Sequence, residues 1–180
     1  MEILPSEMPT IAIICIDCNI QEFLMPCLLL TVSLLYISCL SQQYIWILSG
    51  RLQQYTSSST PVDKEKWSNQ WRWTIARHSV GEELIAYPAL EKHVVGGRAL
   101  ADKDRSQHHV VKQNLSQLEG KLVNDSSFDA LMQETQKVLE QHMHEEEEND
   151  LVKLRDAIPR DEGIRLGSRF KLTKKFVPTQ

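Results

Sequence analysis

Apolar residues recur at helical intervals from Trp67 onward, and they define amphipathic helices. The members of the first stripe are four, three, four and three residues apart, which places them on one helix face: Trp71, Ile75, His78, Glu82 and Ile85. We expect this helix to cover residues 67–95, after the linker TSSSTPVD at 56–63. Pro88 should bend it or close its main segment, and Gly96 and Gly97 should end it.

Two further helices follow from the same period. One is predicted over 99–123, with the stripe Val111, Leu115, Leu118 and Leu122. The other is predicted over 128–157, with the stripe Leu131, Thr135, Val138 and His142. Ser126 or Ser127 should cap the start of this last helix, and Pro159 should stop it. The chain is therefore expected to be all-α, and its basic end, 161–180, to form a short helix or a strap over the bundle.

The first 55 residues depart from this pattern. No charged residue occurs from 23 to 50, and about twenty apolar residues are enough to cross a bilayer. Three interpretations of this atypical segment, 1–55, stay open: a transmembrane helix through residues 23–48, a buried helix that serves as the first helix of the bundle, or sequence that is not native coding sequence, such as a retained intron in a gene model. The basic residues that follow, from Arg51 to Arg72, predict that the C-terminal domain lies in the cytoplasm, with or without a membrane anchor.

Length and charge narrow the classes of function. At 180 residues the chain is long enough for one domain plus an extension. A net charge of −4, without a basic stripe, gives no electrostatic reason to expect nucleic acid as a partner. The four cysteines all lie in the first 39 residues, within or beside the apolar run, which is not the pattern of a disulfide-stapled domain.

Histidine and carboxylate side chains interrupt the apolar stripes of the three predicted helices. His78 and Glu82 are one turn apart on one face and can hold one metal ion together. His108 extends the stripe of the helix over 99–123, whereas His109 turns away from it; Asp104 lies one turn before His108.

The last of the three helices repeats the first arrangement. His142 faces inward with Glu146 one turn beyond it, while Glu147 lies slightly off that line and His144 faces outward. One inward histidine is usually a hydrogen-bonded core residue, but histidines on three successive helices predict a metal site in the core of a helix bundle. Imidazole and carboxylate donors without thiolate favour iron, manganese or zinc, and iron suits this donor set best.

Residues 67–180 resemble the hemerythrin-like (HHE cation-binding) domain in the form common among fungal proteins. The resemblance is carried by WSNQWRWTIARHSVGEELIAYPALEKH, ALADKDRSQHHVVKQNL, LEQHMHEEEENDL and LTKKFVPTQ. It implies an up-down four-helix bundle around a non-heme di-iron centre, with 67–160 as the bundle and a first helix drawn from within 23–56.

The resemblance also implies a set of metal ligands. His78, Glu82, His108 and His142 match the family's ligands, with Glu146 as the first choice and Glu147 as the second choice for the last carboxylate. Asp104 stands where the family has a further histidine, which would favour ferric iron. The histidine of the family's first helix has no counterpart, because no histidine precedes His78 and the expected positions read LSG at 48–50.

These features predict an iron-binding protein that binds oxygen, nitric oxide or peroxide at the metal, for storage, sensing or iron homeostasis. No general base or nucleophile separate from the metal site is identifiable, so the sequence assigns no enzymatic activity. The alternative is a degenerate bundle without metal, acting as a membrane-tethered structural or interaction protein. The missing first-helix histidine and the charge-free run support that alternative.

Overall fold

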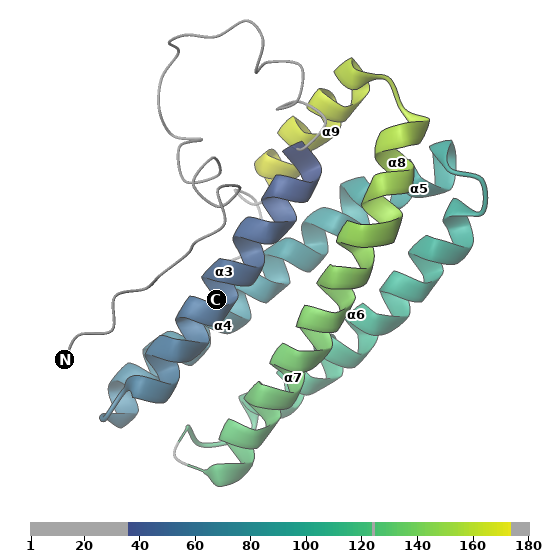
Figure 1. Cartoon of the computed structure of the whole chain (residues 1–180). Coiled ribbons are helices and arrows are strands. Elements are labelled where there is room, and N and C mark those ends of the chain that lie inside the picture. Colours follow the sequence, from purple (N-terminus) through teal and green to yellow (C-terminus); the bar gives the residue numbers. More distant parts are fainter. Residues whose placement is uncertain (1–35, 124, 174–180) are drawn as a thin grey trace, which may run out of the picture.

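The computed structural model describes residues 36–123 and 125–173, which form helices and no strand. The elements in chain order are α3 (Tyr36–Ser57), α4 (Pro61–Gly81), the π-helical turn η1 (Glu82–Ala86), α5 (Tyr87–His93), α6 (Gly97–Glu119), α7 (Ser126–Glu145), the π-helical turn η2 (Glu146–Asp150), α8 (Leu151–Ala157) and α9 (Arg160–Thr173). The long rods formed by α3, by α4 to α5, by α6 and by α7 to α8 lie side by side and alternate in direction, and α9 lies against one end of them (Figure 1). The predicted all-α, up-down four-helix bundle is confirmed.

The helix starts are set by capping side chains. Thr60 accepts a hydrogen bond from the Asp63 amide at 3.1 Å, and Pro61 follows as the first helical residue, so α4 begins six residues earlier than the predicted start at 67. The cap of α7 is Asp125, whose carboxylate accepts from the Ser127 amide at 2.8 Å. The prediction of a serine cap at 126 or 127 was wrong, because the carboxylate of the preceding residue takes that role.

Two glycines shape the turn between α5 and α6. Gly96 adopts φ +76°, a left-handed conformation that favours glycine. A Cβ atom on Gly97 would lie 1.9 Å from the carbonyl oxygen of Leu90, so only glycine lets the two backbones approach this closely. The helix therefore ends at His93, two residues before the predicted end at 95, and α6 begins at Gly97, two residues before the predicted start at 99.

The two rods that carry His78 and His142 are not regular α-helices. Each contains one π-helical turn, η1 and η2, that begins at the carboxylate one turn after the histidine. In η1 the amide of Tyr87 donates to the carbonyl of Glu82, five residues earlier. Pro88 lies just after this turn on the exposed side, so the helix passes through it rather than closing.

Two apolar clusters fill the bundle, one toward each end. The larger cluster joins α3, α4, α6 and α7 and contains Trp71, Tyr55, Phe128, Leu118 and Met143, among others. The smaller one joins η1, α5, α6, α8 and α9 around Tyr87, Leu90, Leu154 and Phe170. Leu122 was predicted to lie in the core but is 80% exposed, because α6 ends at Glu119 and Leu122 falls in the following loop.

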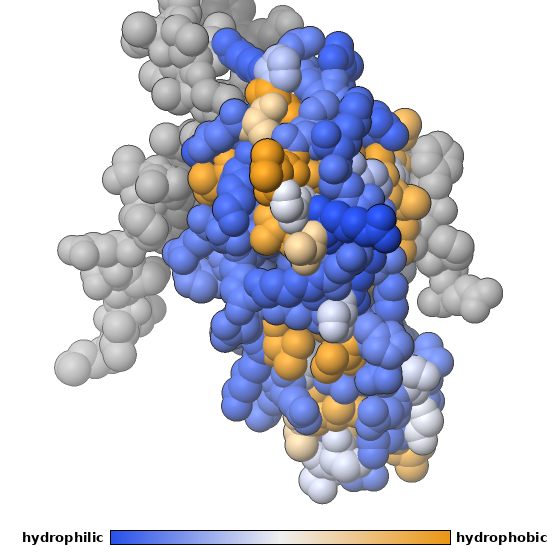
Figure 2. All heavy atoms as spheres, turned by 90° about the vertical axis from the view of Figure 1, so that its right-hand side faces the viewer, coloured by the Kyte–Doolittle hydropathy of each residue, from blue (hydrophilic) through white to orange (hydrophobic). Residues whose placement is uncertain are grey.

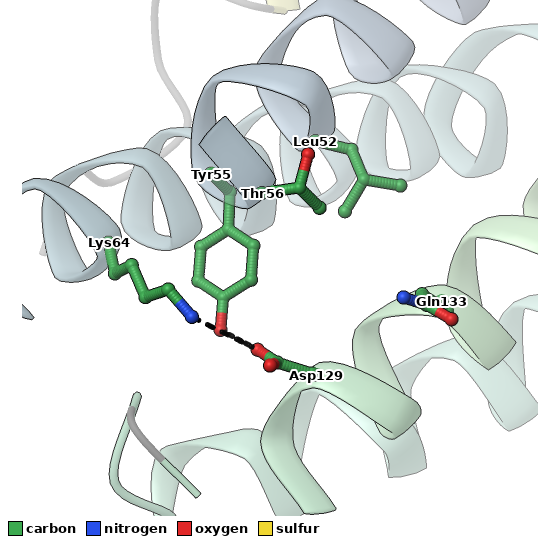
Figure 3. A pocket seen from close by; sticks show the side chains of 6 residues that line it. All are labelled: Leu52, Tyr55, Thr56, Lys64, Asp129 and Gln133. Atoms are coloured by element: carbon green, nitrogen blue, oxygen red, sulfur yellow. Dashed lines mark hydrogen bonds and ion pairs between the residues drawn. The ribbon is translucent and has the colours of Figure 1, made fainter. Parts of the chain in front are cut away.

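Residues 36–55 of the atypical segment lie in α3, which packs against α4 and α7. Tyr55 fixes the end of this helix: its hydroxyl donates to the Asp129 carboxylate on α7 and lies 3.2 Å from the Val123 carbonyl (Figure 3). Lys64 of α4 joins the same carboxylate at 3.7 Å, beside a pocket of about 90 Å³.

The interpretations that concern residues 1–35, including the first half of the predicted membrane segment 23–48, fall outside the described residues. Within the described ranges, no helix has the length and hydropathy needed to cross a bilayer. The face in Figure 2 is largely hydrophilic, with apolar side chains gathered in separate groups.

Candidate metal centre

Six of the seven predicted donor residues come together between the two apolar clusters. They form three overlapping groups whose donor atoms lie within 4.8 Å of one another: Glu82, His108 and His142; His78, Glu82 and Glu146; Asp104, His142 and Glu146. Every one of these side chains is buried, at 4% exposure or less. The site is therefore a polar layer, closed off from water, in the interior of the bundle.

The spacing of the donor atoms suits a metal ion. The Nε2 atoms of His108 and His142 are 3.0 Å apart, and Glu82 Oε2 lies 3.3 Å from His108 Nε2. Two donors bound at about 2.1 Å to one ion, at right angles to each other, are about 3 Å apart. Atoms of these three residues thus stand at the distances expected of neighbouring ligands.

The Nδ1 atom of His108 faces outward to a carboxylate. It lies 3.2 Å from Glu83 Oε1, and Lys112 donates to the same oxygen at 2.7 Å. The carboxylate is an acceptor only, so it fixes the proton on Nδ1 and turns Nε2 toward the other donors. Histidine ligands of metals are commonly oriented in this way by an outer carboxylate.

His142 is oriented by an amide. Its Nδ1 lies 2.8 Å from Gln107 Oε1, and the Gln107 amide nitrogen donates to Glu145 at 3.0 Å. Lys103 holds the same Glu145 carboxylate at 2.6 Å. The chain of contacts runs from the protein surface to the imidazole, and it leaves His142 Nε2 facing His108.

His78 lies at the edge of the site against aromatic rings. Its imidazole stacks on Tyr44 of α3 with ring centroids 4.4 Å apart, and the Phe170 ring of α9 meets it edge-on at 6.1 Å. His78 Nε2 is 2.8 Å from Glu82 Oε1, yet neither ring nitrogen makes a hydrogen bond of good geometry within the described part of the chain. The rings hold the imidazole in place and leave its nitrogens available.

The carboxylates are crowded in a dry site. Burial raises the pKa of Glu146 well above its usual range, and the nearby Glu82 and Asp104 raise it further. Burial also opposes ionisation of Glu82, but His78 and His108 outweigh it and hold the pKa of Glu82 well below its usual range. Burial, followed by Asp150, raises the pKa of Asp104 to about 7.

Several carboxylate oxygens of this layer also lack a hydrogen-bond donor. Among the described residues, no donor reaches Glu82 Oε2, Glu146 Oε2 or either oxygen of Asp104. Buried acceptors without donors are costly unless a cation binds them. The donor set therefore fits a metal ion, on the evidence of its own unsatisfied atoms.

The seventh predicted donor, Glu147, is only half-buried and belongs to none of the three groups found in the described ranges. Glu146 is buried and belongs to two of them. Glu146 follows His142 by one helical turn and so shares its buried face, whereas Glu147 is turned about 100° further round the helix.

On α3, the positions 48–50 bring no metal donor to the site. Leu48 lies in the larger apolar cluster, Ser49 is 3.5 Å from the Gln136 amide nitrogen, and Gly50 is exposed. Among the α3 residues whose side chains are described, 44–57, Tyr44 contacts the proposed donors through its stacking on His78.

Sequence reasoning missed four residues of this site. Glu83 and Gln107 orient the two histidines, and nothing in their spacing distinguishes them from surface residues. Asp150 is fully buried one turn beyond Glu146, where its carboxyl acts on Asp104, and that spacing could have been noticed. Tyr87 is fully buried with its hydroxyl 3.1 Å from His108 Nε2. No α-helical period would place Tyr87 there, because η1 intervenes.

Comparison with known proteins agrees with this geometry. The model of the hemerythrin HHE cation-binding domain matches residues 44–154, which include α3 from Tyr44 and all six grouped donors. An uncharacterized hemerythrin-like protein of Schizosaccharomyces pombe is 40% identical over 133 residues, which are 73% of this chain and 66% of that protein. The chain thus spans just under two thirds of that relative's length. No solved structure matches.

Proposed function

This chain belongs to the hemerythrin HHE cation-binding family, and from that membership we propose that it is a non-heme iron protein with a dinuclear centre. Through the metal it would bind a small molecule, namely oxygen, nitric oxide or peroxide. The cellular role would be storage, sensing or iron homeostasis. The observation that carries the proposal is the pair His108 and His142, whose Nε2 atoms converge while Glu83 and Gln107 hold their outer nitrogens.

The overlap of the three donor groups supports two ions rather than one. Glu82 and Glu146 each belong to two groups, so each carboxylate can bridge two ions. His78, His108 and His142 would be nitrogen ligands, and His142 is grouped once with His108 and Glu82 and once with Asp104 and Glu146. Asp104 would add an oxygen ligand where the family pattern has a histidine, which makes the site more anionic and favours ferric iron.

The side chains around the donors have separate tasks in this proposal. The two apolar clusters exclude bulk water, and Glu83 and Gln107 keep the imidazoles in the tautomer that offers Nε2. Glu146 and Asp104 have raised pKa values without metal, and they would release their protons to solvent when a metal ion binds. Bound iron would supply the redox-active centre to which the small molecule attaches.

The test is the metal content of the purified full-length chain after anaerobic loading with ferrous iron. The proposal predicts close to two iron atoms per chain and the absorption of an oxo-bridged di-iron centre after exposure to air. A chain that retains no stoichiometric metal would instead be the degenerate, metal-free bundle. Loading with zinc in parallel shows whether the site selects iron, since the residue types alone accept both metals.

A further inference from the structure

Tyr87 owes its position to the π-helical turn. In a regular α-helix, a residue five positions after Glu82 would be turned roughly 140° away from it. In η1 the Tyr87 amide instead donates to the Glu82 carbonyl, which brings Tyr87 back over the same helix face. The Tyr87 ring is fully buried, so the turn places its phenol group beside the proposed metal ligands.

The Tyr87 hydroxyl lies among the proposed ligand atoms. It is 3.1 Å from His108 Nε2, and it also makes a hydrogen bond with the Glu146 carboxyl. The same Nε2 atom is 3.0 Å from His142 Nε2 and 3.3 Å from Glu82 Oε2. The phenol oxygen is also 3.5 Å from Nδ1 of the same ring, so it lies beside the His108 imidazole within the donor set, close to the nitrogen that His142 and Glu82 approach.

The proposed ligand set also lacks a counterpart of the family's first-helix histidine, so another residue can supply that ligand. Along α3 no residue from 36 to 57 is a histidine, and among its described side chains, 44–57, Tyr44 contacts the centre by stacking on the His78 ring. Tyr87 approaches from η1 and α5 instead, against His108 of α6 and Glu146 of η2. An anionic oxygen from Tyr87 would complete a site that α3 leaves short of a donor.

We propose that Tyr87 is a metal ligand, its phenolate oxygen binding iron beside His108. The proposal rests on the iron centre proposed above. Binding replaces the O–H bond of the phenol with an oxygen–iron bond, and the proton passes to solvent; the iron keeps its oxidation state in this step. A hard, anionic donor of this kind stabilises ferric iron, which favours sensing or iron handling over reversible oxygen carriage.

Ferric iron bound to a phenolate has a charge-transfer absorption in the visible range, and resonance Raman excitation within it enhances the ring vibrations of the tyrosinate. We expect both signals in the ferric, full-length protein. Tyr87→Phe should abolish both, while Tyr44→Phe and Tyr55→Phe should keep them, measured per iron atom bound. Signals that survive Tyr87→Phe, or that disappear in Tyr44→Phe alone, would overturn the assignment.

The chain has four tyrosines, which provides a second variant in case Tyr87→Phe fails to fold. Replacing the other three with phenylalanine leaves Tyr87 as the one tyrosine, and the charge-transfer band must persist in that protein. Bound iron without the band overturns the role of Tyr87 and leaves the iron centre standing. Absence of bound iron in the wild-type chain overturns the centre itself and this proposal with it.

Discussion

His108 and His142 point their Nε2 atoms at each other across 3.0 Å, from two antiparallel helices. Glu83 and Gln107 draw the Nδ1 protons of both rings outward, so two lone pairs would face each other without a cation between them. Glu82 and Glu83 outweigh burial and raise the pKa of His108, whereas burial lowers the pKa of His142 to about 4. In the metal-free protein a proton on His108 can therefore stand where the metal would bind.

The first prediction follows from the different directions of His142 and His144 on α7, since His142 is buried and His144 is exposed. His142→Ala should abolish stoichiometric iron binding, because it removes a donor shared by two of the three groups. His144→Ala is the matched control, since that side chain is 66% exposed on the same helix. Iron content per chain after loading and desalting measures both. Equal losses in the two variants would contradict the assignment of His142 as a ligand.

The amide that orients His142 gives the second prediction. Gln107→Leu should weaken metal binding by about 10- to 100-fold, because the imidazole loses the acceptor that fixes its tautomer. Gln113→Leu, an exposed change of the same kind on α6, should leave the affinity unaltered. Competition with a chelator of known affinity measures the difference. An affinity unchanged in Gln107→Leu would show that the amide has no part in orienting the ligand.

The third prediction concerns the pH dependence of the metal-free protein. Burial raises the pKa of Asp104 to about 7 and that of Glu146 well above its usual range, and the carboxylates beside His108 raise its pKa too. Above pH 6.5 the unfolded chain has released most of these protons while the folded chain still holds them. The free energy of unfolding should therefore fall as the pH rises from 6.5 to about 8. His142 opposes this fall near pH 6.5, because its imidazole is still partly protonated in the unfolded chain but neutral in the folded one, and this opposing contribution fades as the pH rises toward 8.

Metal loading supplies the control for that experiment. Bound metal takes the place of these protons, so the fall in stability should vanish or reverse in the loaded protein. Urea unfolding curves of both forms at the two pH values measure it. A metal-free protein that becomes more stable toward pH 8 would contradict the assigned protonation states.

The hydrogen bond between Tyr55 and Asp129, at the other end of the bundle, gives the fourth prediction. Tyr55→Phe should lower the free energy of unfolding by about 1 to 2 kcal/mol, because the hydroxyl donates to the Asp129 carboxylate. Asp129→Asn should cost less in that background than in the wild type, since its partner is already gone. Iron content should not change, because Tyr55 lies in the larger apolar cluster, away from the donors. Additive losses would show that the two side chains do not interact.

The helical period predicted the bundle because the stripes match buried faces. Trp71, Ile75, Val111 and Leu118 are all at most 1% exposed, as their spacing requires. The same spacing separates buried His108 and His142 from exposed His109 and His144. It failed for Leu122, where the chain had already left the helix, because periodicity alone does not mark a helix end.

The residues that surround the proposed donors were harder to predict from the sequence. Glu83 and Gln107 act through one hydrogen bond each, and a single polar residue on a helix flank carries no periodic signal. Tyr87 was missed for a different reason, because its direction depends on η1, whose i→i+5 bonding is not encoded in the spacing of apolar residues. The identity of the donors as ligands stays a prediction that the metal analyses above test.

The turns η1 and η2 also affect how many residues these two rods contain. Each turn uses one residue more than an α-helix of equal length, so the residues beyond Glu82 and Glu146 are shifted by one position in register. Deleting a single residue within either turn removes that extra residue, so a regular α-helix replaces the turn and the part beyond it keeps its direction. Leu90 and Leu154 would then stay in the smaller apolar cluster. A one-residue deletion here should therefore leave this end of the bundle folded, while it changes which side chains of the turn face the donors.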